Sequence, residues 1–132
     1  MHMRILVLLP LFFSMHLSAG EWPQAFGPNG NGTVDGKTVS SFSGSENQNI
    51  LWRTKMPSTG QGTPIISNGK VFVTSHERIE EDSETGSAIV GICLDAKTGK
   101  KLWQRKIEGT RTTDLSSLFS DNTAASPVSD GE

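Results

Sequence analysis

The chain has 132 residues, of which 34% are hydrophobic and 20% are charged, and its formal net charge is −2 at pH 7. Its 14 glycines and 6 prolines separate short apolar runs, which is typical of a globular β protein and argues against a helical one. The slight negative charge argues against a nucleic-acid-binding surface, which needs a concentrated basic face. A basic group near the middle of the chain comprises Lys97, Lys100, Lys101, Arg105 and Lys106. It is predicted to be a solvated turn and outer strand, because strand alternation divides its charges between two faces.

The N-terminal 20 residues have the form of a signal peptide. Arg4 precedes an apolar run at residues 5–17, and the small residues Ser18, Ala19 and Gly20 place a cleavage point after Gly20. The apolar run is shorter than the ~20 residues that a helix needs to cross a bilayer. We therefore expect export to the periplasm or the extracellular space, with no membrane span after cleavage.

Residues 21–49 are predicted to be an irregular lead-in rich in glycine, proline and serine. The string GPNGNG at residues 27–32 is no phosphate-cradling loop, because no strand precedes it and no helix follows it. Residues 49–55 are then predicted to be a lead-in strand, in which a Leu-Trp pair is followed by basic residues.

Four further strands are predicted near residues 63–67, 70–75, 88–94 and 101–107. Asn68-Gly69, between the first two, is a strong hairpin dipeptide. The third run is short, apolar and rich in β-branched residues, which favours a strand buried on both faces. The fourth alternates between a side that carries Trp103 and a side that carries Leu102, as a half-solvated outer strand would.

The chain is predicted to reverse tightly between the third and fourth of these strands, in the string CLDAKTGKKLW at residues 93–103. Asp95 can accept hydrogen bonds from backbone N–H groups two or three residues on, and Thr98 can do so more weakly. Gly99 supplies the positive φ that closes a bulged turn. The result is a hairpin with a tryptophan, Trp103, just past its turn.

Two pairs of segments indicate an internal repeat. The Leu-Trp pair at Trp52 recurs 51 residues later at Trp103, and residues 63–69 resemble residues 126–131 at an offset of about 62. Both offsets fit a four-stranded unit of ~40 to 50 residues with inserted loops, which is the period of propeller blades.

Acidic side chains crowd the loop between the second and third strands: Glu77, Glu80, Glu81, Asp82 and Glu84. Their spacing matches no calcium-binding loop, so a solvated hairpin loop is predicted. His76 adjoins this loop with no recognisable nucleophile motif and is predicted to lie on the surface. The single cysteine, Cys93, allows no intrachain disulfide and is predicted to be a buried structural thiol.

The turn segment resembles the tryptophan-docking repeat of the quinoprotein-like (PQQ-like) β-propellers. The pattern of that repeat is Ala, any, Asp, any, any, Thr, Gly, three of any, Trp. Asp95, Thr98, Gly99 and Trp103 match it, and Cys93 stands where the family usually has alanine, which keeps a small apolar side chain. These five residues are the predicted structural repeat motif.

The string EWPQAFGPNGNG at residues 21–32 also resembles the WPQFRGPNGNG opening of many exported bacterial proteins built from these repeats. It departs from that opening at Ala25 and Phe26, where the family usually has Phe and Arg. The two resemblances together cover most of residues 21–132.

The resemblance implies an all-β fold that contains about one complete four-stranded antiparallel blade of a β-propeller. The expected divisions are a signal peptide, a lead-in, a lead-in strand with the first blade, and an inter-blade connection with the start of a second blade, at residues 1–20, 21–49, 50–107 and 108–132. Blades bury their apolar faces against neighbours, and repeats generally need at least ~3 units for a continuous core. We therefore interpret the chain as an N-terminal fragment whose Trp103 docks against a neighbouring blade that it lacks.

Two classes of function remain open. The first is an exported, non-catalytic propeller scaffold that contacts another protein or the cell envelope, as relatives in outer-membrane assembly do. The second is the N-terminal piece of a dehydrogenase that uses pyrroloquinoline quinone with calcium. Such enzymes show adjacent cysteines, calcium ligands on blade-top loops and a catalytic aspartate, none of which is identifiable in this chain. The scaffold is preferred, with no catalytic, cofactor-binding or metal-binding residue assigned and no cofactor expected.

Overall fold

The computed structural model of the chain describes residues 20–36, 39–77, 85–86, 88–109, 113–114 and 123–131. The apolar run of the predicted signal peptide lies outside these residues. So do most of the acidic loop after Glu77 and most of the connection that follows residue 109.

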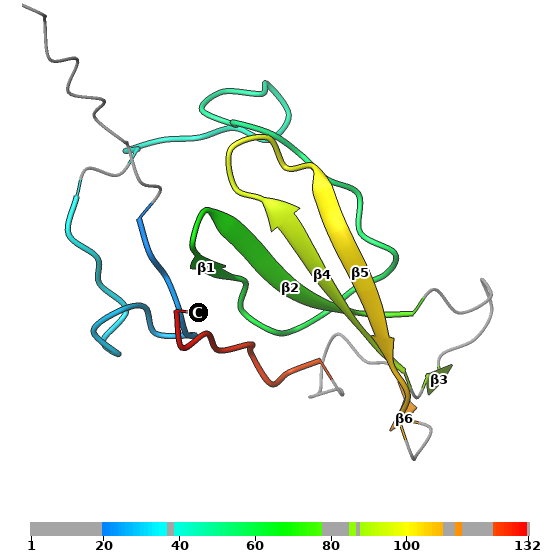
Figure 1. Cartoon of the computed structure of the whole chain (residues 1–132). Coiled ribbons are helices and arrows are strands. Elements are labelled where there is room, and N and C mark those ends of the chain that lie inside the picture. Colours follow the sequence, from blue (N-terminus) through cyan, green and yellow to red (C-terminus); the bar gives the residue numbers. More distant parts are fainter. Residues whose placement is uncertain are drawn as a thin grey trace, which may run out of the picture.

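Four antiparallel strands form one open sheet in the order β1-β2-β4-β5 (Figure 1). Their bounds are β1 Ile65–Ser67, β2 Lys70–His76, β4 Ile89–Asp95 and β5 Lys101–Ile107. Two short strands, β3 Thr85–Gly86 and β6 Thr113–Asp114, pair with each other in a separate two-stranded sheet. The described part of the chain contains no helix long and apolar enough to cross a bilayer. The prediction of an all-β chain with one four-stranded antiparallel blade is confirmed.

The strand boundaries lie close to the predicted ones, with one difference at the start. β5 has the predicted bounds, β1 and β2 differ from the predictions by one or two residues at one end, and β4 is shifted by one residue at both ends. The lead-in strand predicted at residues 49–55 pairs with no described strand. Residues 50–56, called the lead-in segment below, nevertheless alternate between half-buried and exposed, as a strand does. The burial alternates because one side of this segment packs on the face of the sheet. Its backbone is not paired with an edge strand of the sheet.

The apolar core lies on one face of the sheet. Val90, Ile92 and Leu94 of β4 are buried there, and Val71 and Val73 of β2 pack against them. Alternate residues of neighbouring strands point to the same face, which is why these positions gather on one side. The lead-in segment covers this face with two partly buried side chains, those of Trp52 and Met56.

The hairpin between β1 and β2 has the backbone that its sequence predicts. Asn68 and Gly69 both have positive φ, of 50° and 69°. Two successive residues in this region produce the turn whose twist matches that of the flanking strands, and asparagine and glycine tolerate it best. The predicted hairpin is therefore confirmed at this position.

His76 ends β2 and is fully buried, so the prediction of a surface histidine was wrong. Its backbone N–H donates a hydrogen bond to the Thr59 carbonyl at 3.0 Å, and the Ser75 hydroxyl lies 3.0 Å from the same oxygen. A methyl group on Gly60 would collide with the backbone of β2. The chain around Gly60 thus runs along the end of β2 and covers His76. The residues next to His76 in the sequence give no sign of this cover.

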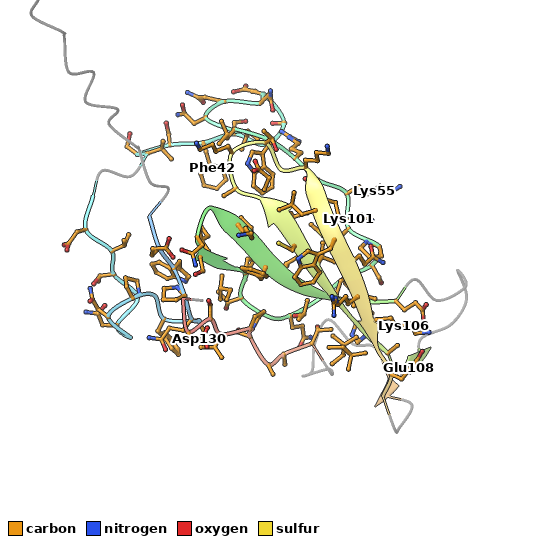
Figure 2. All side chains as sticks on the ribbon, viewed as in Figure 1. Phe42, Lys55, Lys101, Lys106, Glu108 and Asp130 are labelled. Carbon is orange, nitrogen blue, oxygen red and sulfur yellow. The ribbon has the colours of Figure 1, made fainter. Side chains whose placement is uncertain are left out.

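β5 is more exposed than the predicted half-solvated strand. All seven of its residues are exposed, including Leu102 at 47% and Ile107 at 60%. Figure 2 shows Lys101 and Lys106 along this strand. The Lys106 ammonium lies 2.6 Å from Glu77 and 2.9 Å from Glu108, and these carboxylates raise the pKa of Lys106. The five residues of the basic group lie in the turn and on β5, which is the solvated turn and outer strand that the sequence predicts for them.

Candidate functional site

The turn between β4 and β5 is organised by one carboxylate. Oδ1 of Asp95 accepts hydrogen bonds from the Lys97 N–H at 3.1 Å, the Thr98 N–H at 2.8 Å and the Thr98 hydroxyl at 2.7 Å. The Gly99 N–H donates to the Asp95 carbonyl at 2.8 Å, with Gly99 at φ +70°. Three donors on one oxygen fix the loop in a single conformation, which is the role that the sequence pattern predicts for Asp95.

These hydrogen bonds favour the ionised form of the Asp95 carboxyl group. Its pKa is lowered, first by the hydrogen bond from the Thr98 hydroxyl, and then by the Thr98 and Lys97 backbone N–H groups. The nearby charge of Lys97 acts in the same direction, and partial desolvation opposes both effects.

The turn at residues 95–99 also binds a tryptophan that is distant in the sequence, and this binding surface is called the seat below. The indole N–H of Trp52 donates to the Ala96 carbonyl at 2.9 Å. A methyl group on Gly99 would lie 2.5 Å from two ring carbons of Trp52, so the ring lies directly against the Gly99 backbone. The Thr54 hydroxyl donates to the Gly99 carbonyl at 2.6 Å. The lead-in segment is thus fastened to the turn by a ring contact and two hydrogen bonds.

Gly99 therefore meets two independent demands. Its φ of +70° is a conformation that side chains disfavour, and the ring of Trp52 leaves no room for a side chain. The sequence pattern predicts the first demand, since a bulged turn needs a glycine at this point. The second demand is visible only in the structure.

The other members of the predicted motif lie on the opposite face of the sheet from Trp52. Cys93 is fully buried in β4, opposite Phe72 of β2 and Trp103 of β5. Burial raises the pKa of the Cys93 thiol, and the charge of Lys70 lowers it by a smaller amount. Among the described residues Cys93 is a free cysteine. A buried thiol with a raised pKa is poorly suited to nucleophilic or redox chemistry.

Trp103 is the exposed counterpart of Trp52. A β-bulge between Cys93 and Leu94 shifts the register and places Trp103 opposite Cys93. Its ring lies 6.0 Å from that of Phe72, and the Arg105 guanidinium lies 6.0 Å from its centroid. The residue is nevertheless 42% exposed. The structure thus brings Asp95, Thr98 and Gly99 together in the seat and leaves Trp103 outside it.

Sequence reasoning missed three residues of this site: Trp52, Thr54 and Ala96. Trp52 carries a signal, because its Leu-Trp pair recurs at Trp103 within a matching strand pattern. That repeat places both tryptophans at equivalent positions but does not show which one meets the turn of this chain. Ala96 acts through its backbone carbonyl, which leaves no mark on the sequence.

The described residues do not fit a calcium or quinone centre. No group of three or more histidine, cysteine, aspartate or glutamate side chains among them could hold a metal ion. Cys93, the only cysteine of the chain, has no adjacent cysteine to pair with. Asp95 is engaged by its own turn.

In a comparison with protein-family models, residues 34–132 match a family model. The matching model, PQQ_2, is described as outer membrane protein assembly factor BamB. The chain belongs to the PQQ_2 family. Searches of curated proteins and of solved structures each gave no match. The resemblance to PQQ-like repeats is thereby confirmed, and the four-stranded sheet is a blade of this family's β-propeller type.

The first prediction concerns the contact between Trp52 and Gly99. Replacing Gly99 with alanine should lower the free energy of unfolding by about 2 to 4 kcal/mol, because the methyl group is strained at this φ and displaces the indole. Gly69→Ala is the matched control, since Gly69 has φ +69° but nothing within 4 Å of the added methyl group. It should cost only the backbone strain of about 1 to 2 kcal/mol. Urea unfolding measures both, and equal losses would contradict the docking contact.

The second prediction concerns pH. The folded-state pKa of Asp95 lies below its unfolded value, so the turn's contribution to stability is present above the unfolded pKa of ~3.9 and is lost as pH falls through the folded pKa. Asp95→Asn removes this titration. The melting temperature of the native chain should exceed that of Asp95→Asn at pH 6, and the difference should shrink toward pH 2. A difference that is constant with pH would show that the Asp95 carboxylate has no special stabilisation.

Proposed function

We propose that the chain is an exported, non-catalytic β-propeller scaffold that works through contacts with other proteins or with the cell envelope. The observation that carries the proposal is the arrangement of the two equivalent tryptophans. Trp52 is seated on the turn of this blade, while Trp103 stands partly exposed on the opposite face. A blade that receives one tryptophan and presents another is suited to a series of stacked blades.

Trp52 also supports the existence of neighbouring blades. Residues 50–56 lie on this blade as an extended segment with one face packed and no described strand beside it. β5 carries the same Leu-Trp pair and would present Trp103 to a following blade in the same way. A further turn of the Asp95 to Gly99 type would cover the Trp103 ring and bury an aromatic surface of ~150 to 250 Å². These blades are partners that the scaffold requires for a continuous core.

The β5 edge offers a surface for a protein partner. All seven residues of the strand are exposed, and three of them are large and apolar: Leu102, Trp103 and Ile107. An edge strand with exposed apolar side chains favours association with another strand or sheet. The family description, that of an outer membrane assembly factor, also supports a protein-binding role at the envelope. The form of the N-terminal 20 residues supports export.

The alternative, a piece of a quinone-dependent dehydrogenase, has less support. It calls for adjacent cysteines and for metal ligands grouped together. The described residues offer a single buried thiol with a raised pKa and no group of three metal-binding side chains. The Asp95 carboxylate already accepts hydrogen bonds from the backbone N–H and the hydroxyl of Thr98 within its own turn.

The third prediction tests export and the absence of catalysis. The whole chain, expressed in a bacterium, should be recovered outside the cytoplasm with Glu21 as its first residue, as measured by fractionation and intact mass. The exported chain mixed with pyrroloquinoline quinone and Ca²⁺ should reduce a dye acceptor with alcohol substrates no faster than the mixture without protein. Recovery of the uncleaved chain in the cytoplasm would contradict export. A quinone-dependent rate would instead favour the dehydrogenase.

A further inference from the structure

The β1 edge of the sheet is covered by the beginning of the described chain. The Trp22 N–H donates to the Ile66 carbonyl at 2.8 Å, and the Ile66 N–H donates to the Trp22 carbonyl at 2.9 Å. This reciprocal pair is an antiparallel bridge on the side of β1 that faces away from β2. The residue before Trp22 also takes part, because the Glu21 carboxylate accepts a hydrogen bond from the Asn68 N–H at 3.1 Å. Residues 21–22 therefore occupy the position of an additional edge strand.

The same segment also contacts the start of the second repeat. The Ser129 N–H donates to the Pro23 carbonyl at 3.0 Å. Figure 1 shows the blue beginning and the red end of the described chain side by side at the β1 edge. Pro23 is thus hydrogen-bonded to the second repeat, while its neighbour Trp22 is hydrogen-bonded to β1 of the first repeat.

Equivalent positions of the two repeats meet beside this segment. The Thr63 N–H donates to the Ser126 hydroxyl at 2.9 Å, and the hydroxyl groups of Ser67 and Ser129 lie 3.2 Å apart. The two residues of each pair are 63 and 62 positions apart in the sequence, close to the repeat offset. The Asn68 side chain adds a hydrogen bond to a backbone carbonyl of the second repeat, with Nδ2 donating at 2.7 Å.

A local turn holds the backbone of this segment in place. The ring of Trp22 lies against Gly27, where an added methyl group would come within 2.8 to 3.0 Å of three ring carbons. Gly27 has φ +73°, and its N–H donates to the Gln24 carbonyl at 2.9 Å while its own carbonyl accepts from Gln24 Nε2 at 3.0 Å. This is a second contact of a tryptophan ring with a positive-φ glycine, made within one short segment.

We propose that residues 21–27 form an edge clamp, which fastens the β1 sides of two consecutive repeats together and closes this edge to other strands. An open strand edge presents unpaired N–H and C=O groups and pairs readily with other chains. The clamp satisfies both backbone groups of Ile66 and the N–H group of Ser129. It leaves β5 as the edge of this sheet that can accept a partner strand.

Hydrogen exchange measured by NMR on the whole chain tests the clamp. The amides of Ile66 and Ser129 should be protected in the native chain, and both should exchange about tenfold or more faster in Gly27→Ala, because the methyl group displaces the Trp22 ring. Amides of β4 should keep their rates. Gly32→Ala is the matched control, since Gly32 lies just beyond the clamp and has φ +76° but nothing within 4 Å of the added methyl group. It should leave both rates within about threefold of the native values.

Three results would overturn the clamp. The first is an Ile66 amide that is unprotected in the native chain, which needs no variant to detect. The second is an unchanged Ile66 rate in Gly27→Ala. The third is faster exchange at Ile66 without faster exchange at Ser129, because it would mean that the segment covers β1 without joining the two repeats.

Discussion

The seat of the Trp52 indole on the turn of Asp95 to Gly99 is the interaction on which the arrangement of this blade depends. The lead-in segment has no backbone pairing with a described strand, so side-chain contacts hold it to the sheet. The indole N–H, the Thr54 hydroxyl and the ring face all meet the turn within a few ångströms. The turn can receive them only because Asp95 fixes the loop and Gly99 has no side chain. Without this seat, the core face of β4 would lose its cover.

The blade is held on one face and at one edge by segments that are distant in sequence. The lead-in segment covers one face of the sheet, and the edge clamp covers the β1 edge together with the start of the second repeat. The remaining face and the β5 edge are where Trp103 stands partly exposed. In repeat proteins, stability comes from interfaces between neighbouring units as well as from each unit itself. The exposed side of this blade is thus the side on which a following unit would add stability.

The sequence predicted the parts of the fold that depend on local chemistry. The strands, the Asn68-Gly69 hairpin and the turn at Asp95 follow from alternation, β-branched content and the conformational needs of short loops. Contacts between distant segments were less accessible. The burial of His76 depends on the chain around Gly60. Which tryptophan binds the turn at Asp95 depends on which segment lies against this face of the blade, and in this structure it is the segment that carries Trp52. The edge clamp is made mostly of backbone hydrogen bonds, for which residue type gives little signal.

The exchange rates of the indole N–H protons of Trp52 and Trp103, measured by NMR with assignments from Trp→Phe variants, test whether Trp52 is held on the turn. If Trp52 is seated as described, its indole proton should exchange at least about tenfold more slowly than that of Trp103, because within the described residues it is the Trp52 indole that is bonded to a carbonyl inside a packed contact. Equal rates for the two protons would contradict the seat, and with it the explanation of how the lead-in segment is held on the blade.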